Sequence, residues 1–180
     1  GSADESIHFI KKNFPSVNIV DNGANLGWAG GNNAGIPYVK GDYLVFINND
    51  LRVDKNWLLP LLAPFKSNKV GCVSSKILLY NDTNTIGSVG CFFTFLGITG
   101  AIGRGSPSSK FSDFTKFFSP TGTYCIMEKE YFIKIGMFDS DFFLYCEDYD
   151  MGWRILNDGK FNVLSPKSII YHNEHSGGLT

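Results

Sequence analysis

The sequence lacks the features that mark several large classes of protein. Its charges nearly cancel, because 16 Lys and Arg residues stand against 17 Asp and Glu residues, for a formal net charge of −1. Without a basic excess, no broad surface for nucleic acid is expected. No apolar run approaches the ~20 residues that cross a bilayer as a helix, and no apolar core of a secretory leader follows the first residues.

Cysteine is also scarce and widely spaced. The four cysteines are Cys72, Cys91, Cys125 and Cys146, and no two of them form a Cys-x-x-Cys pair. A zinc site built on thiolates is therefore not expected. We interpret these residues as reduced, mostly buried thiols of a cytoplasmic protein.

What the sequence does contain is enough apolar material for a packed core. Hydrophobic residues make up 43% and aromatic residues 15% of the 180 positions, a composition unlike that of a disordered chain. The length suits a single domain over residues 1–180.

Hydrophobic periodicity predicts alternating helices and strands. The expected helices cover residues 3–13, 55–65, 129–135 and 148–157. The expected strands cover residues 17–20, 43–47, 70–79, 122–127, 161–164 and 168–171. Residues 25–35 are expected to form a loop rich in Gly and Asn, and residues 81–120 a hairpin with a flexible segment. This alternation predicts an α/β fold with parallel strands, in which the run 43–47 suits a central strand covered on both faces.

The first candidate site is Asn48-Asn49-Asp50, which ends the apolar run 43–47. Ligands of open α/β sheets bind beyond the carboxyl ends of strands. A carboxylate there suits a divalent cation shared with a diphosphate, because Mg²⁺ takes one or two carboxylates together with phosphate oxygens. The alternative is that Asp50 only begins a turn.

The second candidate is Glu147-Asp148-Tyr149-Asp150, at the start of the expected helix 148–157. Three carboxylates within four residues repel one another, which raises a pKa toward that of a general base. The alternative is that these acids complement the dipole at the helix N-terminus.

Two further signals are weaker. His172 follows the apolar run 168–171, and His is a common metal ligand, although a lone His is more often structural. Segment 25–35 has glycines at which a backbone can approach a phosphate closely, with Trp28 placed to line the site. It does not match the dinucleotide fingerprint, because Ala29 stands where Gly is needed. The alternative is a turn-rich loop that caps a helix.

Taken in this order, the motifs resemble those of the inverting glycosyltransferases of family 2, especially the rhamnosyltransferase-like members. The family loop N-x-G-[FWY]-[AS]-x-G-x-N-x-G is similar to segment 25–35, which reads NLGWAGGNNAG. The family's N-x-D is similar to Asn48-Asn49-Asp50. Its G-x-F-D, E-D, D-x-x-x-R and strand-His segments are similar to residues 136–139, 147–148, 150–154 and 171–172.

The resemblance implies a GT-A-type fold, with a mixed, mostly parallel sheet flanked by helices, and a nucleotide-sugar donor. It assigns the general base to Asp148, with Glu147 orienting the acceptor or tuning that base. It assigns a divalent cation, Mn²⁺ or Mg²⁺, to Asp50 and His172. We interpret Arg154 as a salt-bridge partner of the acidic cluster. The implied donor-binding residues are Asn25, Gly27, Trp28, Gly30, Gly31, Asn32, Asn48, Asn49 and Asp50.

The resemblance also implies transfer with inversion to a saccharide or lipid-linked saccharide acceptor, in polysaccharide biosynthesis. The first residues are similar to a family segment that follows a strand, a helix and a second strand, so roughly 35–40 residues are expected to be missing. Loss of those strands exposes a sheet edge. We therefore expect this stretch to self-associate and to lack transferase activity, and the full-length protein to associate peripherally with the inner face of the membrane.

Two other functions stay open on the sequence. The chain would be a non-catalytic scaffold or sugar-binding module if it does not bind the donor. A nucleotidyltransferase shares a related α/β architecture, but its glycine-rich loop directs a basic residue at a triphosphate. Residues 25–35 contain no Lys or Arg, which argues against that class.

Overall fold

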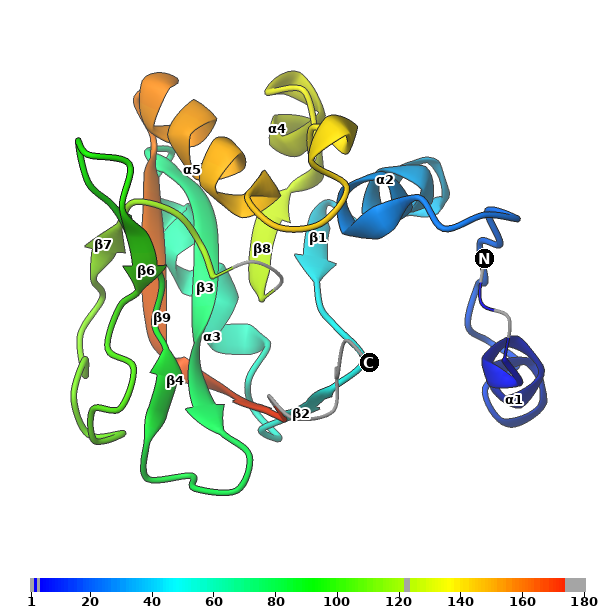
Figure 1. Cartoon of the computed structure of the whole chain (residues 1–180), viewed down its shortest axis with the longest axis horizontal. Coiled ribbons are helices and arrows are strands. Elements are labelled where there is room, and N and C mark those ends of the chain that lie inside the picture. The colour runs from blue at the N-terminus through cyan, green and yellow to red at the C-terminus, as the bar shows by residue number, and fades with distance from the viewer. Residues whose placement is uncertain (1, 3, 122–123, 174–180) are drawn as a thin grey trace.

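The computed structural model describes residues 2, 4–121 and 124–173. Its main feature is a seven-stranded sheet in the order β1-β8-β3-β9-β2, with β4 beside β3 and β7 beside β9 (Figure 1). The strands are β1 (Tyr43–Phe46), β2 (Leu51–Val53), β3 (Val70–Leu79), β4 (Ile86–Ser88), β7 (Lys116–Phe117), β8 (Cys125–Glu128) and β9 (Phe161–His172). A separate hairpin consists of β5 (Cys91–Phe93) and β6 (Thr99–Ala101).

Helices cover both faces of this sheet. The helices of the described chain are α1 (Ser6–Asn13), which stands apart from the sheet (Figure 1), α2 (Gly27–Gly35), α3 (Leu59–Leu62), α4 (Lys129–Lys134) and α5 (Glu147–Asn157), with short 3-10 turns η1 (Ile36–Tyr38), η2 (Ala63–Lys66) and η3 (Ser140–Phe142). Successive strand residues point to opposite faces, so Cys72 packs with the cluster under α4 and α5 while Val73 packs with Leu61 of α3. Helix α1 has no buried residue. No helix in the described part of the chain is long and apolar enough to cross a membrane.

The expected α/β sheet is confirmed and is mixed, but fewer neighbouring strands are parallel than expected. Among the described strands, β3 and β9 pair in parallel, and the other pairs are antiparallel. Strands β1 and β3 run in the same direction, but β8 lies between them and runs against both. Strand β1 is therefore the last strand at its end of the described sheet, and the expectation of a central parallel strand is wrong. An apolar run predicts burial, but it does not predict which strand will lie beside it.

The two long strands carry most of the sheet. Strand β3 spans the predicted residues 70–79 and is buried along nearly its whole length. Strand β9 joins the two short strands that were expected at 161–164 and 168–171. Its register against β3 shifts between Ser165 and Ile169, around Pro166, which has no backbone N–H to donate to the ladder. The proline therefore interrupts the pattern of the strand without ending it.

Two expected elements are wrong. Residues 17–20 form no strand, and residues 25–35, expected to be a loop, contain α2. Four of the nine residues of α2 are glycine, and glycine disfavours a helix by about 1 kcal/mol each. Tertiary contacts, described below, override that local preference. The expected helix over 55–65 is split into α3 and η2, because Pro60 and Pro64 interrupt helical hydrogen bonds.

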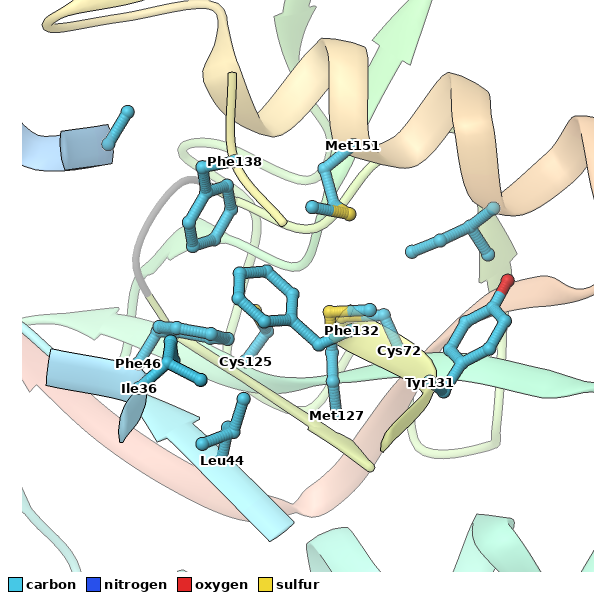
Figure 2. Close-up of a cluster of buried hydrophobic side chains, with 12 residues drawn as sticks. Ile36, Leu44, Phe46, Cys72, Cys125, Met127, Tyr131, Phe132, Phe138 and Met151 are labelled. Atoms are coloured by element: carbon cyan, nitrogen blue, oxygen red, sulfur yellow. The ribbon is translucent and has the colours of Figure 1, made fainter. Parts of the chain in front are cut away.

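One buried cluster fixes the helices on the sheet (Figure 2). Phe46 of β1, Phe132 of α4 and Phe138 form a triangle of rings whose centroids lie 4.9–5.0 Å apart. Edge-on and tilted ring pairs of this kind add to the stabilisation from burial. Met151 of α5 belongs to the same cluster, so the helix that begins with the acidic motif is held against the strand that leads to Asp50.

Candidate active site

Asp50 and His172 lie side by side where β2 pairs with β9. The register places Leu51 opposite His172, and Asp50 Oδ2 lies 3.2 Å from His172 Nε2. The two side chains are 24% and 23% exposed, so one edge of the pair stays open to a ligand. Asp50 Oδ1 is buried and has no hydrogen-bond partner among the described residues. A buried carboxylate oxygen without a partner is costly, and a cation would satisfy it.

A polar cavity of about 360 Å³ opens beside this pair, lined by Asn49, Asp50, Leu51, Tyr80 and Asn173. The backbone N–H of Asn173 donates to the carbonyl of Asp50 at 3.2 Å. Within the described part of the chain, no three His, Cys, Asp or Glu side chains gather around one point. A cation held by Asp50 and His172 therefore needs further ligands beyond the His, Cys, Asp and Glu side chains of the described residues.

Trp28 connects the glycine-rich helix with this strand end. Its indole N–H donates to Asn48 Oδ1 at 2.9 Å, and its backbone N–H donates to the carbonyl of Phe143 at 2.7 Å. The ring packs against Phe46 and, edge-on, against Phe138. One residue of α2 thus joins the Asn48–Asp50 turn to the segment that leads into the acidic helix.

The first residue of α2, Gly27, occupies a position that only glycine fits. Its φ is +70°, and a Cβ at this position would lie 2.2 Å from the carbonyl oxygen of Phe143. The facing segment is itself strained, because Phe143, Tyr145 and Cys146 all have positive φ, at 55°, 71° and 70°. Such conformations cost free energy and occur at functional sites. The close approach therefore fixes the backbone immediately before Glu147.

Glu147 and Asp148 begin α5 and are buried. Asp148 Oδ1 accepts a hydrogen bond from the backbone N–H of Tyr149 at 2.9 Å. Glu147 Oε2 has no hydrogen-bond partner among the described residues. Burial raises the pKa of Glu147, and the charge of Asp148 acts in the same direction. Neighbouring carboxyl groups in different surroundings can take different roles in proton transfer.

The third carboxylate of the motif has a structural partner. Asp150 Oδ2 accepts from Nε and Nη2 of Arg154, at 2.9 and 2.5 Å. The remaining nitrogen, Nη1, donates to the carbonyl of Ile135 at 2.6 Å. Arg154 is the expected salt-bridge partner of the acidic cluster, and it pairs with Asp150 one helical turn away. This pair also holds α5 to the end of α4.

The residues expected to bind the donor lie in two places. Asn25, Gly27 and Gly31 line a polar cavity of about 350 Å³ at the start of α2. Asn49 and Asp50 line the separate cavity beside β2. The Trp28–Asn48 hydrogen bond connects the elements that carry these two cavities.

Two of the expected donor-binding residues, Gly30 and Asn32, make packing or hydrogen-bond contacts within α2 or at its N-terminus. Gly30 is buried, and a Cβ there would lie 3.1 Å from Leu26. The side-chain amide of Asn32 donates to the carbonyl of Trp28 at 2.8 Å, within the helix. Their positions support the shape of the site, whereas contact with a donor stays a prediction.

Sequence reasoning missed two residues that organise the site. Asn33 forms hydrogen bonds with the backbone of Phe138 and so holds α2 against the segment before α5. Its position in the motif of residues 25–35 is the sequence feature that could have indicated this role. Tyr149 connects α5 to the hairpin: burial raises the pKa of its hydroxyl, and a hydrogen bond with the Cys91 thiol acts in the same direction. No sequence pattern pairs residues that lie so far apart in the chain.

Known proteins are similar to this chain in sequence and in fold. The model of "Glycosyl transferase family 2" matches residues 1–136. Polypeptide N-acetylgalactosaminyltransferase 11 of Xenopus tropicalis is 30% identical in an alignment of 169 residues that covers 87% of this chain and 28% of that protein. The O-antigen biosynthesis protein RfbC of Myxococcus xanthus is 29% identical in an alignment of 154 residues that covers 79% of this chain and 12% of that protein. The chain thus spans less than a third of the length of either relative.

A solved structure gives the same architecture. The crystal structure of GalNAc-T7 with UDP, GalNAc and Mn²⁺ matches with a TM-score of 0.76 at 18% identity, over 95% of this chain and 35% of that one. The family match includes α2, β1 and the Asn48–Asp50 turn and ends before the acidic motif of α5. From the family match over most of its length and from this shared architecture, the chain is a member of glycosyl transferase family 2 with the GT-A fold.

Proposed function

We propose that this chain is the catalytic core of an inverting, metal-assisted glycosyltransferase that moves a sugar from a nucleotide-sugar donor to an acceptor hydroxyl. The family and the fold support sugar transfer as the class of reaction. The acceptor is a saccharide or a lipid-linked saccharide. Transfer of a hexose, in the manner of the rhamnosyltransferase-like members, is the subtype that the motifs favour.

The observation that carries the proposal is the Asp50–His172 pair. A carboxylate and an imidazole lie 3.2 Å apart at the mouth of a polar cavity, and Asp50 Oδ1 has a buried lone pair without a partner among the described residues. A carboxylate oxygen and an imidazole nitrogen form a donor set that fits Mn²⁺, and Mg²⁺ is accepted less readily because it prefers oxygen ligands. Diphosphate oxygens of a donor would supply ligands that the described residues do not.

A cation held there would supply positive charge beside the departing nucleoside diphosphate. The chain's own residues would do the rest. The Trp28–Asn48 hydrogen bond orients the turn that carries Asp50, and the contact of Gly27 with Phe143 fixes the approach to α5. These contacts hold the site residues in fixed positions, and correct orientation of reacting groups contributes much of the rate enhancement of enzymes.

Asp148 is the proposed general base, which takes the proton of the acceptor hydroxyl as that oxygen attacks the anomeric carbon. The contact from Tyr149 N–H occupies Oδ1 of this side chain. Glu147 is the proposed tuning residue, because it is buried beside Asp148 and burial raises its pKa. A neighbour that holds its proton more tightly lessens the repulsion that Asp148 meets from a second buried negative charge.

One experiment tests this function directly. The full-length protein is incubated with a panel of nucleotide sugars with and without Mn²⁺, and the anomeric configuration of the product is read from proton NMR couplings. We expect cation-dependent consumption of one donor, with inverted configuration. Retained configuration would overturn the inverting mechanism. Failure to bind any nucleoside diphosphate with Mn²⁺ would instead identify a non-catalytic scaffold.

A further inference from the structure

Arg52 of β2 holds its guanidinium group over two tyrosine rings, close in the chain to Asp50. It lies opposite Tyr171 of β9, where the red end of β9 meets β2 in Figure 1. Its Cζ lies 4.3 Å from the centroid of the Tyr171 ring and 5.2 Å from that of the Tyr80 ring. Distances of this size give a cation–π attraction. The positive charge is therefore held in one place without being neutralised.

Tyr80 connects this guanidinium group to the polar cavity beside the Asp50–His172 pair. It lines that cavity together with Asp50, and its backbone N–H donates to the carbonyl of His172 at 3.0 Å. Its side chain is partly exposed. One wall of the cavity is thus also a surface on which Arg52 rests. A ligand in the cavity that contacts Tyr80 therefore comes close to Arg52.

The guanidinium group of Arg52 keeps its donors for a ligand. Within the described part of the chain, no ion pair joins it to an Asp or Glu side chain. The tyrosine rings contact its plane, whereas the N–H groups lie at its edge, where a guanidinium group binds two oxygens of a phosphate at once. The side chain is exposed, so a ligand has access to these groups.

The charges of the occupied site do not balance without a second positive group. Among the described residues that line the cavity, Asp50 is the charged one. A divalent cation on Asp50 keeps only part of its charge, because the carboxylate is negative. A nucleoside diphosphate carries more negative charge than that remainder. A basic side chain beside the cavity would offset the difference, as Arg and Lys do where phosphoryl groups are bound.

We propose that Arg52 binds a phosphate oxygen of the donor's diphosphate, and that Tyr80 and Tyr171 position its guanidinium group. This inference rests on the proposed function, from which it takes the nucleotide-sugar donor and the cation at Asp50. It adds a contact with the diphosphate itself, apart from the base and the sugar. Arg52 is thus a binding residue, and the two tyrosines are positioning residues.

Isothermal titration of the full-length protein with UDP, GDP and dTDP in the presence of Mn²⁺ tests the inference. Arg52→Gln removes the charge and should weaken binding of the nucleoside diphosphate by roughly tenfold or more, the scale for a hydrogen bond to a charged group. Arg52→Lys keeps the charge but loses the planar group, so its affinity should fall between the two. An affinity of Arg52→Gln equal to that of the wild type would overturn the proposal.

Lys55→Gln is the matched control. Lys55 is exposed, follows β2, and loses the same charge in this variant. Because exposed charges are screened by salt, the change should leave affinity within about twofold. An equal loss of affinity in Lys55→Gln would show that overall charge controls binding, and the assignment to Arg52 would be wrong. Circular dichroism checks that each variant is folded.

Two changes at Tyr80 test how the guanidinium group is positioned. Tyr80→Phe keeps the ring and should bind as the wild type does. Tyr80→Leu removes the ring and should weaken binding about two- to fivefold, the scale of an exposed cation–π contact. Combined with Arg52→Gln, Tyr80→Leu should have no further effect. A further loss of the same size would mean that Tyr80 acts on the ligand directly, and its positioning role would be wrong.

Two further readouts separate a contact with the diphosphate from other effects. Inorganic pyrophosphate with Mn²⁺ should lose the same factor in Arg52→Gln as UDP does, and a loss with UDP alone would contradict the proposal. Wild-type affinity should fall more steeply with added salt than that of Arg52→Gln, and equal slopes would contradict it too. A wild-type protein that binds no nucleoside diphosphate with Mn²⁺ would overturn the proposed function and this inference together. Wild-type binding that Arg52→Gln leaves unchanged would overturn this inference alone.

Discussion

Asn33 and Phe138 exchange two hydrogen bonds although 105 residues separate them in the chain. The side-chain amide of Asn33 donates to the carbonyl of Phe138 at 2.7 Å, and the N–H of Phe138 donates to Asn33 Oδ1 at 3.2 Å. Phe138 also packs on Trp28, in the same helix as Asn33. This contact holds the glycine-rich helix α2 against the segment that leads to Asp148.

Asn33→Ala should therefore destabilise the fold, by about 1–3 kcal/mol, because two backbone groups of Phe138 lose their partner. Chemical denaturation measures this difference. Asn32→Ala is the matched control, because the side-chain amide of the neighbouring Asn32 donates to the carbonyl of Trp28 within the same helix. A loss of stability that is no larger than that of the control would show that the contact with Phe138 contributes little.

Asp50→Ala should abolish the part of nucleoside diphosphate binding that depends on Mn²⁺, while the fold stays intact. The reason is that Asp50 supplies the carboxylate beside His172. Isothermal titration with UDP, GDP and dTDP in the presence of Mn²⁺ measures the effect. Asp42→Ala, an exposed residue just before the other end of β1, should bind as the wild type does. If Asp50→Ala binds the nucleoside diphosphate with Mn²⁺ as tightly as the wild type does, Asp50 is not a ligand of the cation.

Asp148→Asn should lower turnover by roughly 10²–10⁴ in the full-length protein, the usual scale for loss of a general base. Donor affinity should change little, because Asn has nearly the same shape. The control is Asp158→Asn, an exposed carboxylate just after the other end of α5. If Asp148→Asn keeps a turnover near that of the wild type, Asp148 is not the general base and another carboxylate has that role.

Glu147→Gln should change how stability depends on pH. Because the folded-state pKa of Glu147 is raised, mainly by burial, the folded protein holds this proton more tightly than the unfolded chain. Wild-type stability from this group is therefore full below the ordinary pKa, 4.5, and falls as pH rises through the raised value. The Gln variant should lack that fall, so its melting temperature relative to wild type should rise between acidic and neutral pH. Exposed Glu130→Gln should show no such trend.

Self-association is expected through the free edge of β1. In the described sheet β1 pairs with β8 alone, and an uncovered strand edge favours pairing with another chain. Light scattering after size exclusion should show species larger than a monomer, and Tyr43→Lys at this edge should reduce them. Phe114→Lys, also at an exposed aromatic residue, should have no effect. A strict monomer at high concentration would contradict the prediction.

Several features followed from the sequence because they depend on neighbouring residues. The apolar runs located β1 and β3, and the start of α5 followed from its acidic first turn. The order of motifs indicated the family, which the family match confirms. The family resemblance also led us to expect the fold, the closeness of Asp50 and His172, and a salt bridge from Arg154 to the acidic cluster. Members of one family share the relative positions of their motifs in space.

Tertiary structure alone decided the rest. Segment 25–35 has poor helix propensity, yet it is helical because Trp28 and Asn33 gain partners from residues 48, 138 and 143. The direction of β8 between β1 and β3 depends on pairing over long distances in the chain. Burial of Glu147, and with it the direction of its pKa shift, depends on what packs over α5. Local sequence records propensity and charge, whereas pairing, burial and close approach arise only when distant segments meet.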